Sequence, residues 1–288
     1  MELPTSSSAE AVISVMGLTC RYDRTTALDD VTLHIPRGSV FGLVGENGAG
    51  KTTLIRHILG LQRPQTGSLQ VFGLNPVAEP TKVLARLGYL SETRDLAPWM
   101  TVEEMIRFTG AFYPNWDFEY AEELRKQFDL VPTAKISTLS QGQLAKSALL
   151  AALAHRPELL VLDEPSSGLD PIVRRDILEA IIRTVAEEGR TVLFSSHLLD
   201  EIERVSDFVG FLHQGKLAIT GTMDEVKSRY RVFTMADRCE GAEVLSATKQ
   251  GDEWEILARA TMRVGETKIL SERDASLEDI FVGLASSQ

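Results

Sequence analysis

Apolar and polar residues follow two patterns along this chain, and each pattern predicts a different kind of strand. Residues 12–18 and 29–35 alternate apolar with polar positions, which is typical of antiparallel strands with one face in water. Residues 39–44 and 159–162 form almost unbroken apolar runs, which predict strands buried on both faces. Two further strands are predicted at 67–73 and 191–195.

Helices are predicted in the segments that separate these strands. They lie at 52–59, 80–87, two within 101–130 on either side of a turn at 113–117, 141–155, 171–187, and from His197 onward. Residues 206–220 predict a hairpin that turns at His213–Gly215. Because strands alternate with helices, the sequence predicts an α/β fold whose core is a parallel sheet.

The pattern also divides the chain into regions. Residues 1–10 are rich in serine and predict a disordered tail. Residues 11–228 predict one large α/β domain, in which about 94–155 lacks convincing strands and is interpreted as a helical insertion. Residues 229–288 hold several short strands and a terminal helix near 277–284, which predict a small C-terminal α+β domain.

Composition narrows the class of protein. With 288 residues, of which 43% are hydrophobic, the chain is long enough for one large domain and a small appendage. Its net charge of −11 argues against a general nucleic-acid binder, which would carry a basic excess. Cys20 and Cys239 lie far apart, so we expect free thiols in a reducing compartment. No apolar run reaches the length of a membrane span and the first residues lack a signal-peptide pattern, so we expect a soluble intracellular chain that reaches membranes only through a partner.

The segment Gly45–Thr52 reads Gly-Glu-Asn-Gly-Ala-Gly-Lys-Thr, a phosphate-binding pattern placed between a predicted strand and a predicted helix. Its glycines let the backbone curl so that successive N–H groups and the helix N-terminus face one anion. Lys51 is expected to reach the β- and γ-phosphates, and the Thr52 hydroxyl to hold Mg²⁺. The alternative is a glycine-rich turn with a surface lysine, which the strand and helix on either side make improbable.

Two acids end the apolar strand at 159–162. Asp163 is expected at the carboxyl end of that strand, beside the phosphate loop, where it holds Mg²⁺ through water. Glu164 follows at the edge of the site, where a carboxylate polarises the attacking water. The alternative is an ordinary boundary between strand and turn with solvated acids, and the upstream phosphate loop favours the functional interpretation.

Two further positions carry candidate chemistry. His197 follows the strand at 191–195, and its imidazole is expected to contact the γ-phosphate and the attacking water, although a histidine there also suits a helix start. Ser140 and Gly142, in Leu139–Gln143, precede a helix and form a possible anion-binding feature. A plain N-cap serine explains Ser140 equally well on chemistry alone.

Together these motifs make the chain resemble the nucleotide-binding subunits of ABC transporters, over roughly residues 12–225. The matching motifs are Walker A at Gly45–Thr52, Walker B at Leu159–Asp163 followed by Glu164, the signature at Leu139–Gln143, the D-loop at Ser167–Asp170, the switch histidine at His197 and the adenine-stacking aromatic at Tyr22. The ending Ser276–Phe281 is similar to the tail of bacterial ABC ATPases that pair with separate permeases, many of them exporters.

Three positions depart from the family pattern or have a second interpretation. Gln141 stands in the signature where glycine is commonest, and because Ser140 and Gly142 remain we expect function to survive. Glu92 takes the place of the usual Q-loop glutamine; a carboxylate still suits Mg²⁺, but its charge puts the usual hydrogen bonding in doubt. Tyr22 is also explained as an aromatic at a strand edge.

The resemblance implies a P-loop NTPase core with a parallel sheet, an N-terminal antiparallel β subdomain, a helical insertion and a C-terminal α+β appendage, and it implies an ATPase that uses ATP and Mg²⁺. Glu164 and His197 would be catalytic, and Thr52, Asp163 and Glu92 would lie at the metal. The implied nucleotide-binding residues are Tyr22, Gly45, Glu46, Asn47, Gly48, Ala49, Gly50, Lys51, Thr52, Thr53, Ser140, Gly142 and Gln143.

The resemblance further implies that two chains pair head to tail around two ATP molecules and drive an integral membrane permease, with no nucleic-acid partner. The chain would then lie at the cytoplasmic face of the membrane, held by a permease that docks near Glu92–Met100, where Leu96, Trp99 and Met100 are expected in a loop. Trp99 packing into the insertion's own core is the alternative there. For the whole chain, the rival functions are a soluble ABC ATPase without a transport role and a P-loop kinase or GTPase, although no guanine-reading Asn-Lys-x-Asp motif is found.

Overall fold

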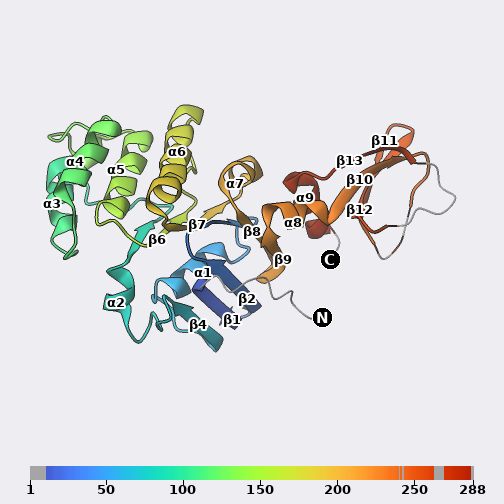
Figure 1. The fold of residues 1–288 in the computed structure, drawn as a ribbon, viewed down its shortest axis with the longest axis horizontal. Helices are drawn as coiled ribbons and strands as arrows, with labels where there is room; N and C mark the ends of the chain where they lie inside the picture. Colours follow the sequence, from blue (N-terminus) through green and yellow to red (C-terminus); the bar gives the residue numbers. More distant parts are fainter. Residues whose placement is uncertain (1–10, 240, 242, 263–268, 287–288) are drawn as a thin grey trace.

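The computed structural model describes residues 11–239, 241, 243–262 and 269–286, so the predicted tail at 1–10 lies outside the described residues. The helices α3, α4 and α5 lie side by side at one end of the molecule, and a C-terminal module of strands β10 to β13 with helix α9 lies at the other (Figure 1). The strands that carry the predicted site lie between them.

The central sheet has six strands in the order β5-β6-β7-β3-β8-β9. Its strands are β3 (Val40–Val44), β5 (Leu87–Leu90), β6 (Leu159–Asp163), β7 (Thr191–Ser196), β8 (Phe208–His213) and β9 (Lys216–Thr222). All neighbouring pairs are parallel except β8 and β9, which form the predicted hairpin through Gln214 and Gly215, both at positive φ. The α/β fold is therefore confirmed, with a mixed rather than wholly parallel sheet.

A smaller antiparallel sheet, β2-β1-β4, confirms the N-terminal β subdomain. Its strands are β1 (Ala11–Tyr22), β2 (Thr25–Pro36) and β4 (Thr66–Val71), and helix α1 (Lys51–Ile58) packs beneath it. Leu54, Ile55 and Ile58 of α1 join the apolar faces of both sheets in one buried cluster. That cluster fixes the start of α1, and so the phosphate loop, against the central sheet.

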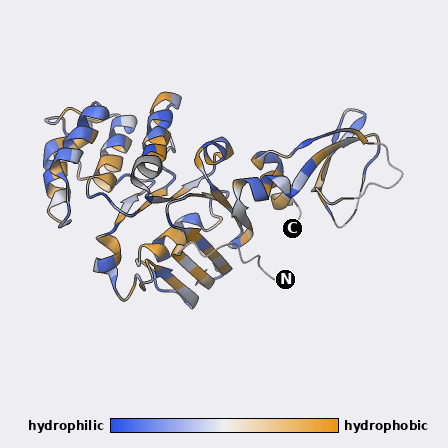
Figure 2. Cartoon of the chain, in the orientation of Figure 1, coloured by the Kyte–Doolittle hydropathy of each residue, from blue (hydrophilic) through white to orange (hydrophobic). Residues whose placement is uncertain are grey.

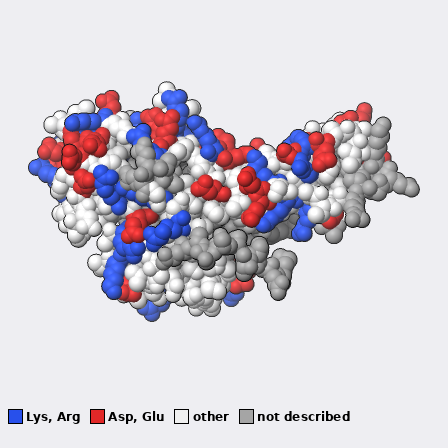
Figure 3. Space-filling view, viewed as in Figure 1, with Lys and Arg blue, Asp and Glu red and all other residues white. Residues whose placement is uncertain are grey.

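The other face of the central sheet is covered by helices that form a second buried cluster. They are α3 (Val102–Gly110), α4 (Phe118–Gln127), α5 (Gln141–Leu153), α6 (Pro171–Glu188) and α7 (Leu199–Val205), with a 3₁₀ turn at Ile136–Thr138. Between 94 and 155 the only β pairing is one isolated bridge, Thr101 to Lys135, as the insertion predicts. Hydrophilic residues cover much of α3 and α4 (Figure 2), and acidic and basic side chains are interspersed on the face shown in Figure 3.

The C-terminal module is a four-stranded antiparallel sheet, β11-β12-β10-β13, with one helix. Its elements are β10 (Tyr230–Met235), β11 (Val244–Gln250), β12 (Glu253–Arg259), β13 (Ile269–Asp274) and α9 (Leu277–Ser286), and α8 (Met223–Ser228) leads into it. Phe281 of α9 packs on Phe211 of β8 with ring centroids 5.6 Å apart. Because Leu257 and Ile280 share the cluster of the central helices, the boundary at 228 and 229 stays a prediction.

Two predicted helix limits were wrong. The helix predicted at 80–87 ends earlier, as α2 (Pro80–Leu84), because Leu87–Leu90 pairs with β6 and becomes the edge strand β5. The helix predicted from His197 begins at Leu199, because the Ser196 hydroxyl accepts the Leu198 N–H and holds His197 before the first turn. Both cysteines are free. Among the described helices, none is both long and apolar enough to cross a membrane.

Candidate functional site

The phosphate loop lies between strands from both sheets, and two of its glycines are required by close backbone approach. A Cβ atom on Gly45 would lie 2.4 Å from the carbonyl oxygen of Leu212 at the end of β8. Gly50 has φ of 110°, and a Cβ atom there would lie 2.4 Å from the carbonyl oxygen of Ala27 in β2. The loop is therefore threaded between β2 and β8, and any side chain at these positions would displace it.

A cleft of about 270 Å³ opens above this loop, and we call it the phosphate-loop cleft. Its lining residues come from β2, the phosphate loop, α1 and the segments after β5 and β6: Ala27, Glu46, Asn47, Gly48, Gly50, Lys51, Thr52, Thr53, Glu92 and Glu164. Gly45 and Ala49 are buried behind it. Most of the residues predicted for nucleotide binding are thus brought together, with the predicted base and Glu92 in the same cleft.

Three charged or polar side chains meet at Glu164, and two of them, Lys51 and Glu164 itself, line the cleft. Lys51 Nζ lies 2.9 Å from Glu164 Oε1 and donates to the Gly45 carbonyl oxygen at 2.5 Å. Glu164 Oε2 lies 2.7 Å from His197 Nδ1. The Lys51 and Glu164 side chains are each 6% exposed, whereas that of His197 is 42% exposed. A buried carboxylate therefore lies between the phosphate-loop lysine and a histidine that opens to solvent.

The backbone of Glu164 is held in a conformation that few residues adopt. Its φ is +48°, and it opens a turn in which the Ser167 N–H donates to the Glu164 carbonyl oxygen at 3.1 Å. The Glu164 N–H donates to Ser195 Oγ, which itself donates to Asp163 Oδ1 at 2.8 Å. Ser195 therefore orients both acids. No local sequence pattern marks Ser195 beyond its position at the end of a core strand.

The signature segment, Leu139–Gln143, is satisfied by its own hydrogen bonds. Ser140 is the N-cap of α5: its hydroxyl accepts the Gln143 N–H at 3.2 Å, and the Gln143 side chain accepts the Ser140 N–H at 3.0 Å. Gly142 is buried, and a Cβ atom there would lie 2.8 Å from Val173 Cγ2. None of these three residues lines the phosphate-loop cleft of the described chain. The N-cap interpretation holds within one chain, and the phosphate role stays a prediction.

Tyr22 and Asp163 lie near the cleft without lining it. Tyr22 is 43% exposed at the end of β1, and its hydroxyl donates to Gln62 Oε1 at 2.5 Å. It faces Thr25 across the hairpin that leads to Ala27 of the cleft. Asp163 is 1% exposed at the end of β6. Adenine stacking on Tyr22 therefore stays a prediction, consistent with an accessible ring.

The donors around the cleft suit a hard cation held mainly by a substrate. Within the described part of the chain, no group of three or more His, Cys, Asp or Glu residues could hold a metal ion. Mg²⁺ usually binds one or two protein carboxylates together with phosphate oxygens and water. The Thr52 hydroxyl and the Glu92 carboxylate in the cleft, with the Asp163 carboxylate behind it at the end of β6, are oxygen donors of that kind, so these residues fit Mg²⁺.

The segment predicted to dock a permease, Glu92–Met100, which we call the docking loop, carries one exposed aromatic residue. Trp99 is 72% exposed, whereas Leu96 and Met100 are half-buried against the cluster of the insertion helices. The alternative in which Trp99 packs into the insertion core was therefore wrong.

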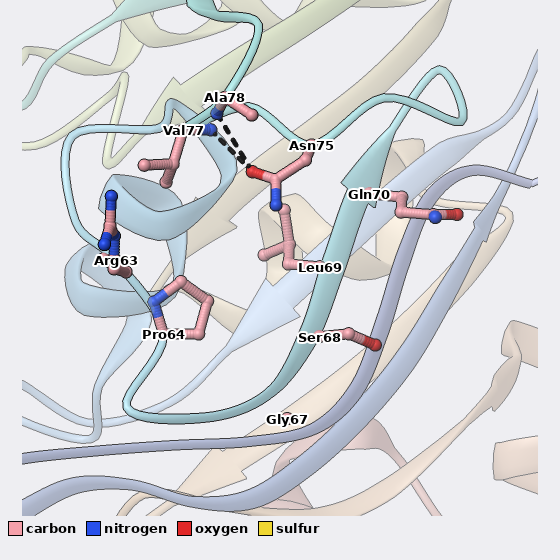
Figure 4. A pocket seen from close by; sticks show the side chains of 9 residues that line it. All are labelled: Arg63, Pro64, Gly67, Ser68, Leu69, Gln70, Asn75, Val77 and Ala78. Atoms are coloured by element: carbon pink, nitrogen blue, oxygen red, sulfur yellow. Dashed lines mark hydrogen bonds between the residues drawn. The ribbon is translucent and has the colours of Figure 1, made fainter.

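A second cavity, of about 350 Å³, lies beside β4 and shares no residue with the phosphate-loop cleft. Figure 4 shows that Asn75 turns its side-chain oxygen onto the backbone N–H groups of Val77 and Ala78, at 2.9 and 3.2 Å. Because this oxygen closes a local turn, it is not directed at a ligand. The site chemistry is concentrated in the phosphate-loop cleft.

Comparison with known proteins decides the family. A profile of the family described as ABC transporter matches residues 28–167. The chain is 33% identical over 225 residues to the ABC transporter ATP-binding protein YtrB of Bacillus subtilis, which covers 78% of this chain and 77% of that protein. The chain belongs to the ABC transporter family. It is also 33% identical over 234 residues to the bacitracin transport ATP-binding protein BcrA of Enterococcus faecalis, covering 81% of this chain and 76% of that one.

Solved structures agree with this ABC transporter assignment. An ATP-binding subunit of an ABC transporter superposes with a TM-score of 0.69 at 32% identity, over 75% of this chain and 92% of that chain. The dimeric post-hydrolysis cassette MJ0796, bound to ADP and Pi, superposes with a TM-score of 0.67 at 22% identity, over 73% and 98%, and shows the same fold. The chain is thus the ATP-binding subunit of an ABC transporter, and its ATP hydrolysis energises transport. That prediction is confirmed over its soluble, kinase and GTPase rivals.

Proposed function

We propose that this chain hydrolyses ATP in the phosphate-loop cleft with Glu164 as the general base. The observation that carries the proposal is that Glu164 lines the cleft and contacts both Lys51, at 2.9 Å, and His197, at 2.7 Å. A general base must lie within hydrogen-bond reach of the water that it activates, and the cleft places this carboxylate opposite the phosphate loop.

Binding of ATP rearranges the Lys51 contacts. The phosphates accept hydrogen bonds from the N–H groups of the phosphate loop and of the N-terminus of α1. Lys51 then leaves Glu164 and contacts the β- and γ-phosphates. Glu164 Oε1 is then free to take a proton from the water that attacks the γ-phosphorus, while His197 holds Oε2. Attack on phosphorus breaks the bond to the β-phosphate, and ADP and phosphate leave.

Thr52, Asp163 and Glu92 are the residues that would hold Mg²⁺ in this cleft. The ion supplies positive charge that offsets the charge developing on the phosphate oxygens. Ser195 keeps the Asp163 carboxylate in place through its hydrogen bond at 2.8 Å. The Glu92 carboxylate, in place of a neutral glutamine, adds negative charge to the cleft and so favours the metal-bound nucleotide over the free one.

Two copies of the chain would pair head to tail, so that Ser140, Gly142 and Gln143 of one copy meet the γ-phosphate bound by the other. Two observations support this arrangement: Ser140 is exposed, and the signature segment lies outside its own chain's cleft. The related cassette MJ0796 is dimeric with ADP and Pi bound. Closure on ATP and opening after hydrolysis would then move the permease.

The permease would hold the chain at the cytoplasmic face of the membrane, through the docking loop around Trp99. An aromatic residue that is 72% exposed is the kind of anchor that a partner's groove or helix buries. Export is the direction that we propose, because relatives include the Nod factor export ATP-binding protein I of Neorhizobium galegae, 29% identical over 312 residues.

The test is Glu164→Gln, which keeps the shape of the side chain and removes its basicity. We expect ATP hydrolysis to fall by about a hundredfold or more, as for loss of a general base, with ATP binding retained. Slow hydrolysis should hold the dimer closed, so light scattering should detect a dimer with ATP and Mg²⁺. Glu119→Gln, an exposed change on α4, is the matched control. Normal hydrolysis by Glu164→Gln would move the base role to His197.

A further inference from the structure

One cation of the docking loop is buried although no acid pairs with it. Arg94 is 6% exposed, and its Nη2 donates to the carbonyl oxygens of Pro165 at 3.1 Å and Ser167 at 2.6 Å. Burial lowers the pKa of its guanidinium. Among the described residues no carboxylate forms an ion pair with Arg94, although the charge of Glu92 acts against the fall in its pKa, and its Nε has no hydrogen-bond partner. Burying such a charge opposes folding, so packing does not explain this arginine.

The two acceptors of Arg94 belong to the turn that begins with the proposed base. This base turn, Glu164–Ser167, is closed by the hydrogen bond from the Ser167 N–H to the Glu164 carbonyl oxygen. Ser166 Oγ anchors the turn on its other side, because it donates to Glu201 Oε2 at 2.6 Å. The direction of the Glu164 side chain therefore depends on where Arg94 and Glu201 hold the turn.

The backbone around Arg94 forms a tight turn, so we expect a movement of the loop to displace the Arg94 guanidinium as well. Arg94 has φ of +52°; its N–H donates to the Ser91 carbonyl oxygen at 3.1 Å, and its own carbonyl oxygen accepts the Leu96 N–H at 2.8 Å. The open Trp99 lies five residues further along the same loop. Arg94 thus connects the loop that carries the exposed Trp99 to the base turn, through its two hydrogen bonds.

We propose that Arg94 is a positioning residue that couples the docking loop to the catalytic carboxylate. A partner that binds the loop at Trp99 displaces the Arg94 guanidinium. Its two hydrogen bonds then displace the carbonyl groups of Pro165 and Ser167, and the base turn changes the direction of the Glu164 side chain. The proposal rests on the proposed function, because it takes Glu164 as the base. Coupling between two sites is reciprocal, so nucleotide in the cleft must also change the surroundings of Trp99.

The experiment uses Trp99 as the reporter in the full-length chain. The other two tryptophans are replaced by Trp116→Phe and Trp254→Phe, since the chain has three. In this parent chain, Trp99 emission and calorimetric binding are followed during titration with the non-hydrolysable ATP analogue AMP-PNP and Mg²⁺. Arg94→Gln removes the guanidinium and its charge, and Arg94→Lys keeps the charge without the guanidinium. The matched control is Arg107→Gln, at a side chain on α3 that is 64% exposed.

We expect the nucleotide to shift Trp99 emission in the parent chain and in Arg107→Gln, and the shift to be lost in Arg94→Gln and reduced in Arg94→Lys. With ATP, kcat of Arg94→Gln should fall about a hundredfold, the loss expected when a catalytic group is misplaced by about 1 Å. Nucleotide affinity should stay within about twofold of that of the parent chain. A merely structural arginine would change stability without separating kcat from affinity in this way.

An emission shift that persists in Arg94→Gln, or a parent chain that binds nucleotide with no shift, would overturn the coupling. A parent chain that binds no nucleotide would overturn the proposed function and this inference with it, and calorimetry separates that result from the other two. Thermal melting shows whether Arg94→Gln is folded. If it is not, Arg94→Lys carries the test, and an undiminished shift in that variant counts against the proposal.

Discussion

The phosphate loop and the signature segment both lie at the start of a helix, yet the polar groups of the two helix starts are satisfied in different ways. Helix α1 begins after Gly50 with no side-chain cap, so its first N–H groups are left for an anion. Helix α5 begins after Ser140 with a complete capping box. Lys51 and Glu164 add buried charge to the first site, whereas Ser140 at the second is exposed.

The difference assigns unequal tasks to the two helix starts. The uncapped α1, which begins at Lys51, allows a single chain to bind a triphosphate with its full negative charge. The capping box of α5 already uses the N–H groups of Ser140 and Gln143, so α5 has fewer free donors than α1, which suits a second contact to a phosphate that another copy already holds. With the proposed head-to-tail pairing, one chain would contain both halves of an ATP site without joining them, and substitutions in each half should have separable effects.

Lys51→Ala should have the largest effect, because it removes the charge of the first half. Loss of a charge-assisted hydrogen bond of about 1.5–3 kcal/mol weakens ATP binding by about tenfold to a hundredfold. The buried Glu164 then lacks its partner and repels the phosphates, so Lys51→Ala with Glu164→Gln should recover part of the affinity. Calorimetry measures both, with the exposed Lys216→Ala as control. Unchanged affinity in Lys51→Ala would mean that this loop does not hold the triphosphate.

Ser140→Asp separates the two roles of the signature serine. Aspartate is as good an N-cap as serine, so stability should stay within about 0.5 kcal/mol, and ATP binding should not change. The added carboxylate repels the γ-phosphate of the facing copy, so hydrolysis should fall by about tenfold or more. Ser140→Ala is the matched variant: it loses about 1 kcal/mol of helix capping without adding charge. Normal turnover by Ser140→Asp would leave the serine as a cap alone.

The last effect is on stability rather than on ATP chemistry, and it concerns the far end of α5, where His155 follows the helix that Ser140 begins. Its ring stacks on Tyr113 with centroids 3.9 Å apart, its Nε2 lies 3.1 Å from the Leu87 carbonyl oxygen, and burial lowers its pKa from 6.5 to about 4. Since the unfolded chain binds a proton that the folded chain does not, stability should be full above pH 6.5 and fall as pH drops toward 4, by up to about 3 kcal/mol.

Urea unfolding at pH 7 and pH 4.5 measures this loss. His155→Phe keeps a ring beside Tyr113 and cannot take a proton, so its stability should depend less on pH than that of the unchanged chain. Equal pH dependence in both chains would show that His155 does not set it. Retained binding of nucleotide at pH 4.5 while α5 loosens would show that the two halves differ in stability as well as in chemistry.

Sequence reasoning could predict what short-range patterns encode. Gly45–Thr52 combines a motif, a strand and a helix within one stretch, and its place in the fold follows directly. Glu164 could be placed near Lys51 because parallel strands β3 and β6 end at the same edge of the sheet. Strand β5 was missed because its partners in β6 lie 72 residues further along the chain, as in the pair Leu87 and Leu159, too far for any local pattern.

The contacts that orient the site were hidden for the same reason. Ser195, Arg94 and Glu201 touch the acids and the base turn from distant parts of the chain, and nothing in their own surroundings distinguishes them from other polar residues. For Ser140 the sequence left two roles open, because a cap and an anion contact need the same residue type at the same helix position.

The most direct measurement of the central claim, that each ATP site is built from two copies, is to mix the two impaired variants. Lys51→Ala chains keep an intact signature segment, and Ser140→Asp chains keep an intact phosphate-loop cleft. Random pairing makes about half of the dimers mixed, each with one complete site, so about a quarter of the normal ATPase activity should return on mixing. No recovery at any ratio, with mixed dimers shown to form, would contradict a site shared between copies.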